Sequence, residues 1–273
     1  MKCDLEKGTI YYEVYGEGRP LILLHGMGVD HRHMKSAMEP FFNHRAGWKR
    51  IYFDMPGMGK SNQAGKWITS NDDMLEVVLD FIDQVIPDQR FVVAGTSYGG
   101  YMARGVLYQR QALIDGLLLI VPAIVPKETR TVPPQVTLVE DPKLLAEIAP
   151  EVVEGFKAMV VVQNRKVLDS FNTDIIPAAK LFDPELEPKL RANYAYSFEV
   201  DKLAEPFDGP TLILTGRQDG EGGYQDAWNI LENYPRATFA VLDRAGHALG
   251  VEQEGLFTAL VHEWLDRVEE FAG

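Results

Sequence analysis

A serine stands between two glycines at the end of an apolar run, where its hydroxyl can act as a nucleophile. The hexapeptide Gly95-Thr96-Ser97-Tyr98-Gly99-Gly100 directly follows the apolar residues 91–94. This arrangement predicts a buried strand, a sharp turn and the start of a helix. Because glycine lacks a β-carbon, Gly95 and Gly99 allow strand and helix to approach closely. We expect Ser97 to adopt a strained backbone conformation with its hydroxyl in a cleft.

A serine hydroxyl is a poor nucleophile at neutral pH and needs a neighbouring base. His247 suits this task, because an imidazole accepts and returns a proton near pH 7. It lies in an Ala-Gly-His segment after the last apolar run. Three carboxylates follow the preceding run, those of Asp219, Glu221 and Asp226. Any of them could accept a hydrogen bond from the second ring nitrogen, and Asp219 could instead cap the helix after it.

These residues lie at the ends of apolar runs that are typical of the strands of one sheet. Continuous runs alternate with helical patterns, which predicts an α/β fold with a mostly parallel sheet covered on both faces. In such sheets ligands bind beyond the carboxyl ends of the strands, where all these motifs fall. The predicted strands are 10–15, 20–24, 48–53, 91–94, 114–121, 211–214 and 237–242, and the main helices are 98–109, 251–269 and one capped by Ser70.

One segment interrupts the alternation. Residues 123–207 show no clear strand, several prolines punctuate them, and helical stretches are predicted at 143–148, 151–168 and 186–198. The segment is too long for an ordinary connection. We therefore predict a core of residues 1–122 and 208–273, with a helical cap of residues 123–207 lying over the strand ends.

The composition indicates which partners to expect. The 273-residue chain has a formal net charge of −13, which argues against nucleic acid or an anionic membrane surface as a partner. Its one cysteine, Cys3, cannot form a disulfide within the chain and is typical of a reducing compartment. The sequence shows no signal peptide and no apolar stretch of transmembrane length. We expect a cytoplasmic protein, and the oligomeric state stays open.

Together these motifs resemble the α/β-hydrolase superfamily, and more closely its cap-bearing serine hydrolases, such as esterases and C–C hydrolases. The resemblance covers nearly the whole chain outside the predicted cap. Ser97, Asp219 and His247 occur in the order that this fold uses. A His25-Gly26 pair follows the second core strand, and the pattern D-x-P-G-x-G-x-S follows the third.

The resemblance implies a role for each of these residues. Ser97 attacks a carbonyl, His247 acts as base and then as acid, and Asp219 fixes the imidazole tautomer. The backbone N–H groups of Met27 and Tyr98 form the oxyanion hole. His25 and Gly26 order the oxyanion loop and take no part in the chemistry. The reaction implied needs no cofactor and no metal.

The function implied is hydrolysis of an ester or related acyl bond of a small substrate through an acyl-enzyme. An aspartate nucleophile, as in haloalkane dehalogenases and epoxide hydrolases, is excluded by Ser97. Three alternatives stay open: a C–C hydrolase of vinylogous diketones, an acyltransferase or perhydrolase, and a non-catalytic ligand-binding receptor. An arginine facing an acidic substrate would favour the first, and Arg165 and Arg191 are the candidates.

The neighbouring histidines His25, His31 and His33 also raise the question of a metal site. The sequence suggests no carboxylate or cysteine to complete a ligand set. We therefore expect His31 and His33 to be solvated loop residues and predict no metal.

Overall fold

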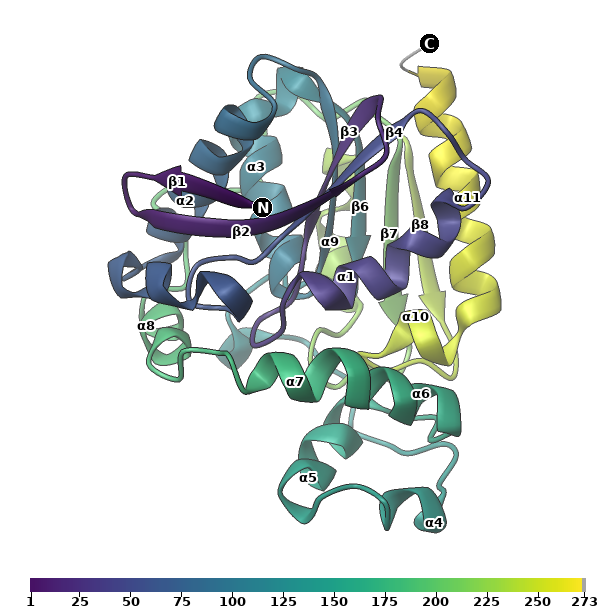
Figure 1. The fold of residues 1–273 in the computed structure, drawn as a ribbon. Coiled ribbons are helices and arrows are strands. Elements are labelled where there is room, and N and C mark those ends of the chain that lie inside the picture. Colours follow the sequence, from purple (N-terminus) through teal and green to yellow (C-terminus); the bar gives the residue numbers. More distant parts are fainter. Residues whose placement is uncertain (272–273) are drawn as a thin grey trace.

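A twisted eight-stranded sheet runs through the molecule in the computed structural model, which describes residues 1–271 (Figure 1). The strand order is β1-β2-β4-β3-β5-β6-β7-β8. The β1–β2 and β2–β4 pairs are antiparallel, and every pair from β4–β3 to β7–β8 is parallel. The predicted α/β architecture is therefore confirmed. The strands are β1 (Lys2–Leu5), β2 (Gly8–Tyr15), β3 (Arg19–Leu24), β4 (Trp48–Phe53), β5 (Phe91–Thr96), β6 (Ile114–Ile120), β7 (Thr211–Gly216) and β8 (Ala237–Leu242).

Helices cover both faces of this sheet and bury two apolar clusters against it. Helices α2 and α3 pack on one face, and α1 and α11 pack on the other (Figure 1). Strands β5, β6 and β7 are buried along their whole length, which explains why they read as continuous apolar runs. The helices are α1 (His31–Met38), α2 (Asn71–Val85), α3 (Tyr98–Arg110), α4 (Pro142–Leu145), α5 (Pro150–Met159), α6 (Arg165–Ser170), α7 (Ile176–Ala179), α8 (Leu186–Ala192), α9 (Gln225–Asn229), α10 (Leu249–Glu252) and α11 (Glu254–Phe271).

Helix α2 begins where the sequence predicts it, at a capping box. The Ser70 hydroxyl accepts a hydrogen bond from the Asp73 N–H at 3.2 Å, and the Asp73 carboxylate accepts one from the Ser70 N–H at 3.1 Å. Two backbone donors that the first turn leaves free are satisfied in this way. An N-cap of this kind typically contributes about 1 kcal/mol.

The 123–207 segment is built from helices α4 to α8, which lie beyond the ends of the parallel strands (Figure 1). The single helix predicted over 151–168 is wrong, because α5 ends at Met159 and α6 starts after Asn164. The intervening valines are β-branched and favour extended backbone, and Val162 forms a β-bridge with Val139. The helix predicted over 186–198 also ends early, at Ala192.

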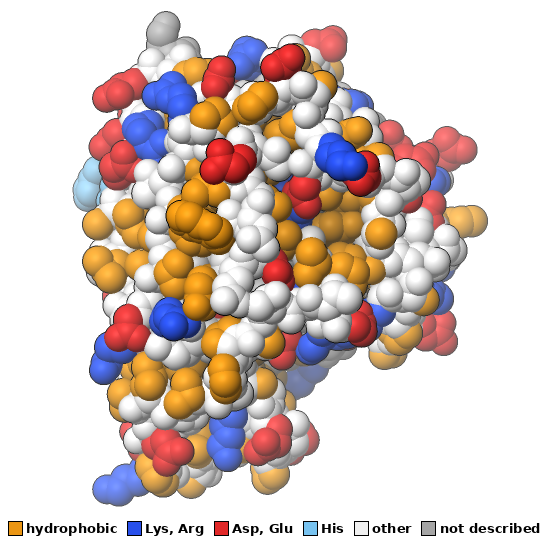
Figure 2. Space-filling view, turned by 180° about the vertical axis from the view of Figure 1, so that it is seen from behind, with side chains coloured by type: hydrophobic (Ala, Val, Ile, Leu, Met, Phe, Trp, Pro, Cys, Tyr) orange, Lys and Arg blue, Asp and Glu red, His pale blue; other side chains and the backbone are white. Residues whose placement is uncertain are grey.

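The surface carries the acidic excess of the sequence. Figure 2 shows acidic side chains spread over the face seen from behind, among lysines, arginines and apolar groups. Within residues 1–271, no helix combines the length and the apolar character needed to cross a bilayer.

Candidate active site

Ser97 sits in a strained turn between β5 and α3. Its φ of 53° and ψ of −116° are rare for a residue with a β-carbon, and such strain costs on the order of 1–3 kcal/mol. The surrounding backbone fixes the turn, since the Ser97 N–H donates to the Ile120 carbonyl at 2.9 Å. A β-carbon on Gly95 would lie 2.1 Å from the Gly99 carbonyl oxygen, and one on Gly99 would lie 2.2 Å from that of Leu24. Both positions therefore require glycine, because neighbouring backbone lies too close to leave room for a β-carbon.

The structure brings Ser97, His247 and Asp219 into one hydrogen-bonded line. The Nε2 atom of His247 lies 2.9 Å from Ser97 Oγ, and its Nδ1 atom lies 2.9 Å from Asp219 Oδ2. The other carboxylate oxygen, Oδ1, accepts the N–H groups of Glu221 and Gly222, both at 2.9 Å. Asp219 is completely buried, so the carboxylate is held rigidly behind the imidazole.

The electrostatics of the pair fix the tautomer of the neutral imidazole and stabilise the imidazolium that forms when His247 takes a proton. Burial acts to lower the pKa of His247, but the Asp219 carboxylate outweighs it and holds this pKa above its ordinary value. Burial acts to raise the pKa of Asp219, and His247 together with two backbone N–H groups brings it below its ordinary value. Asp219 is thus ionised at neutral pH and accepts the Nδ1 proton, which leaves Nε2 free to accept the proton of Ser97.

The two other carboxylates considered from the sequence point elsewhere. Glu221 pairs with Lys127 at 3.0 Å, and Asp226 accepts the N–H of Thr131 at 2.8 Å. Asp219 is the one of the three that contacts His247.

The predicted oxyanion donors belong to the residue after Ser97 and to the loop after β3, which lines the same cavity. Tyr98 is the first residue of α3, where backbone N–H groups have no partner within the helix. Its hydroxyl donates to Asn71 Oδ1, so the side chain points into the protein. Met27 and Gly26 line the same cavity as Ser97. A β-carbon built on Gly26 would lie 3.6 Å from that of Ser97, so the loop packs directly against the serine.

His25 holds this loop in place. Its Nε2 atom accepts the N–H of Met55 at 2.9 Å, and its Nδ1–H donates to the Gly26 carbonyl at 2.8 Å. The side chain is completely buried, and burial lowers its pKa, so the ring is neutral at neutral pH. His25 therefore ties the loop after β3 to the loop after β4.

The expectation of a solvated His31 is wrong, and the structure brings carboxylates to it that the sequence did not suggest. Single ligand atoms of Asp30, His31 and Asp54 lie within 4.8 Å of one another, and all three side chains are buried. These atoms already take part in hydrogen bonds, since His31 Nδ1 lies 2.6 Å from Asp54 Oδ1 and Asp30 accepts from Arg32 at 2.6 Å. We interpret the cluster as a network that fixes the start of α1.

His33 also departs from the expectation of a solvated loop residue. It lines the cavity together with Ser97 and His247, and its Nδ1 atom is buried without a hydrogen-bond partner among the described residues. Burial lowers its pKa to about 4, so it is neutral at neutral pH.

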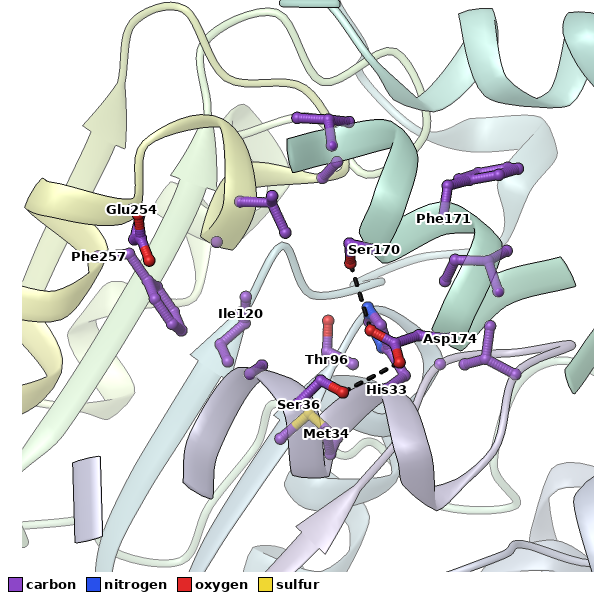
Figure 3. Close-up of a pocket in the computed structure, with 18 of the residues that line it drawn as sticks. His33, Met34, Ser36, Thr96, Ile120, Ser170, Phe171, Asp174, Glu254 and Phe257 are labelled. Carbon is purple, nitrogen blue, oxygen red and sulfur yellow. Dashed lines mark hydrogen bonds between the residues drawn. The ribbon is translucent and has the colours of Figure 1, made fainter. Parts of the chain in front are cut away.

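A cavity of about 490 Å³ opens beside Ser97 and His247. Much of its wall is apolar, with Met34, Ile120 and Phe257 among the lining residues (Figure 3). One side is polar and includes Ser36, Ser170 and Asp174. The two arginines considered for an acidic substrate are not among the lining residues. They form exposed ion pairs instead, Arg165 with Glu147 and Arg191 with Glu187, so neither faces the cavity.

Two carboxylates near the site, the half-buried Glu252 and the buried Asp174, have no signal in the sequence. Glu252 accepts the N–H groups of Val161, Val162 and Gly246, and so links the 123–207 segment to the loop that carries His247. Asp174 lies on the cavity wall. Each contacts one group far along the chain, Val161 for Glu252 and Ser36 for Asp174, and neither belongs to a motif, so spacing alone does not reveal them.

Comparison with known proteins gives one family and several relatives. The family described as "Serine aminopeptidase, S33" matches residues 19–254. A pimeloyl-[acyl-carrier protein] methyl ester esterase of Legionella pneumophila (strain Corby) is 24% identical over 269 residues, covering 94% of this chain and 99% of the relative.

Solved structures share the fold. An alpha/beta superfamily hydrolase from Oenococcus oeni PSU-1 superposes with a TM-score of 0.87 at 27% identity, covering 98% of this chain and 99% of the other. A thermophilic esterase from Thermogutta terrifontis gives a TM-score of 0.71 at 20% identity, covering 98% of both chains. At that identity the second likeness supports the fold alone.

Proposed function

The chain belongs to the Serine aminopeptidase, S33 family of the α/β-hydrolase superfamily, and we propose that it cleaves carboxylic esters of small substrates. The observation that carries the proposal is the continuous hydrogen-bonded line from Asp219 through His247 to Ser97 at the wall of a cavity. The names of its relatives agree with this reaction, since pimeloyl-[acyl-carrier protein] methyl ester esterases recur among them.

The first half of the reaction forms an acyl-enzyme. Ser97 Oγ attacks the ester carbonyl carbon while its proton passes to His247 Nε2, 2.9 Å away. The imidazolium that forms is stabilised by the Asp219 carboxylate against Nδ1. The tetrahedral intermediate then expels the alcohol, which takes the proton from Nε2. In the second half, water attacks the acyl group by the same route and releases the acid.

The charge that develops on the carbonyl oxygen needs preorganised donors. We assign this role to the backbone N–H groups of Met27 and Tyr98, as the resemblance implies. The α3 N-terminus adds a partial positive charge near the same place. Removal of one such donor typically costs about 100- to 1,000-fold in kcat. The buried hydrogen bonds of His25 keep the Met27 loop in position.

We also propose that helices α4 to α8 act as a cap, so that residues 123–207 form a unit distinct from the core. Their position beyond the strand ends supports this division (Figure 1). The polypeptide of this segment closes one side of the cavity, through Val167, Ser170 and Phe171. Such a cover excludes water and shapes the space available to the substrate.

The C–C hydrolase alternative finds less support. An arginine facing an acidic dienone substrate would favour it, but the two arginines considered for this role are held in ion pairs outside the cavity. Lys166, which does line the cavity, is paired with Glu254 at 2.5 Å. A carboxylate, Asp174, occupies the polar side of the cavity instead.

The test uses p-nitrophenyl acetate hydrolysis and labelling by a fluorophosphonate. The wild-type protein should turn over the ester and become labelled, and Ser97→Ala should lose both. The matched control is Ser197→Ala, since Ser197 is exposed and bonded to Asp72. Turnover of the ester by Ser97→Ala at the wild-type rate would remove this serine from the mechanism. Absence of turnover and of label in the wild-type protein would refute the proposed activity.

A further inference from the structure

The polar side of the cavity is organised around one buried carboxylate. Asp174 is 6% exposed and lines the cavity. Ser36 Oγ–H donates to its Oδ1 atom at 3.0 Å, and Ser170 Oγ–H donates to its Oδ2 atom at 3.3 Å (Figure 3). These two hydroxyls come from elements on opposite sides of the carboxylate, α1 and α6. The carboxylate is therefore clamped in one orientation.

This carboxylate has no cationic partner. Among the ion pairs of residues 1–271, which require a nitrogen within 4.0 Å of a carboxylate oxygen, none involves Asp174. The nearby Arg32 is held by Asp30 at 2.6 Å and acts on Asp174 only at longer range. A buried carboxylate is normally paired or bound to a ligand, because its desolvation is costly. Consistent with incomplete compensation, burial raises the pKa of Asp174 above its usual value.

The directions of the hydrogen bonds make the group acceptor-only. Because the Ser36 and Ser170 hydroxyls donate their protons to Asp174, each hydroxyl can only accept a hydrogen bond from a further group. The carboxylate oxygens also have unused lone pairs. The side-chain oxygens of Asp174, Ser36 and Ser170 can therefore accept hydrogen bonds from a ligand but not donate them. A ligand carboxylate would be repelled by the charge of Asp174.

The backbone that carries Asp174 is unusual as well. Residues Phe171–Ile175 form a π-helical turn, in which the Ile176 N–H bonds back to the Phe171 carbonyl. Pro177 accounts for this turn, because it has no N–H to offer and its ring crowds the carbonyl of Thr173. Single π-turns within helices frequently occur at functional sites. Asp174 lies in this turn and lines the cavity.

We propose that Asp174, clamped by Ser36 and Ser170, is a specificity subsite that binds a hydrogen-bond-donating group of the substrate, an ammonium or a hydroxyl. The subsite rests on the proposed esterase function, because it lies in the cavity beside Ser97. An ammonium offers three donors and the missing positive charge, and a hydroxyl offers one donor. The substrates selected are esters with such a group at a distance from the scissile bond, in preference to esters that end in a carboxylate.

The experiment measures binding of three six-carbon probes, hexylamine, 1-hexanol and hexanoate, by ligand-observed NMR titration. The Ser97→Ala protein is used beside the wild type, so that the measurement does not depend on turnover. We expect hexylamine or 1-hexanol to bind at least about tenfold more tightly than hexanoate, as a hydrogen bond to a charged group allows. The two arms distinguish a charged donor from a neutral one.

The variants distinguish the effect of Asp174 from that of the protein's net charge. Asp174→Asn should reduce the preference over hexanoate by about tenfold or more. The matched control, Asp208→Asn, makes the same change at an exposed residue that does not line the cavity and should keep the preference. Ser36→Ala removes one compensating donor but keeps the charge, so the preference for hexylamine should persist or increase. Each comparison is a ratio within one protein, so a change in the amount of folded material cancels.

Two results would overturn the subsite. One is hexanoate binding as tightly as both other probes to the wild-type protein. The other is the same preference in Asp174→Asn as in Asp208→Asn. Parallel assays with p-nitrophenyl acetate keep this outcome apart from a failure of the proposed function, since loss of selectivity with normal turnover refutes only the subsite.

Discussion

Glu252 is expected to control the rate of the reaction although it lies outside the triad. Its carboxylate accepts three backbone N–H groups: Gly246 at 2.7 Å, Val161 at 2.7 Å and Val162 at 2.9 Å. Gly246 directly precedes His247 in the chain. The bonds therefore fix the loop that carries His247 to the segment between α5 and α6.

The substitution Glu252→Gln keeps the shape of the side chain but replaces one acceptor oxygen with an NH₂ group. Whichever way the amide turns, at least one backbone N–H then faces a donor. A buried polar group left in this state costs about 1–3 kcal/mol. If the loop moves to relieve it, His247 moves too, and a displacement of about 1 Å in a reacting group can cost about 100-fold in rate. We expect kcat to fall by roughly 10- to 100-fold, with a smaller change in KM.

Steady-state kinetics on p-nitrophenyl acetate and thermal unfolding are the assays. The control is Glu263→Gln, which makes the same change on an exposed face of α11. A fall in Tm without any fall in kcat would mean that Glu252 stabilises the fold but does not position His247. A variant equal to the control in both measurements would refute the argument entirely.

Three further predictions follow from the geometry. Asp219→Asn should lower kcat by about 10,000-fold, because the imidazole tautomer is lost. Asp226→Asn should keep a kcat near that of the wild type. The reverse result would mean that Asp226, and not Asp219, orients the imidazole. His247 must be neutral to accept a proton and its pKa is held above 6.5 by Asp219, so kcat/KM should fall on acidification with a midpoint above that value, as a pH profile would show. Gly99→Ala should reduce both Tm and activity, because the new β-carbon would lie 2.2 Å from the Leu24 carbonyl oxygen; an unchanged Tm would contradict the crowding seen at this turn.

The sequence predicts the core well because its signals are local. Strands β5, β6 and β7 are buried on both faces, so their apolar runs are continuous and easily recognised. The strand predicted at 237–242 coincides with β8. The candidate triad is found from the same kind of signal, because each of its residues follows one of these strands. The short edge strand β1 was not predicted, since Lys2–Leu5 is too brief and too polar to give a pattern.

The segment between β6 and β7 is harder to predict because its structure depends on contacts with the core. Helix α8 ends at Ala192, and the chain after it packs on α3, where Tyr194 and Tyr196 stack on Tyr101. Asn71 holds the same stretch by donating to the Tyr194 carbonyl at 2.8 Å. These contacts join residues between 93 and 123 positions apart in the sequence, so no local periodicity indicates them.

The same stretch of chain that supplies the proposed subsite also holds the catalytic base. The Met159 carbonyl accepts the N–H of His247 at 2.9 Å, and Asp174 follows on the next helical stretch. A substrate group that binds Asp174 therefore contacts the same segment whose Met159 carbonyl helps to position His247. If both proposals hold, a substrate with the matching donor should have a higher kcat as well as a lower KM, because its binding restricts the motion of His247. A substrate without the donor should react through a less ordered site, so selectivity should be larger in kcat/KM than in Kd.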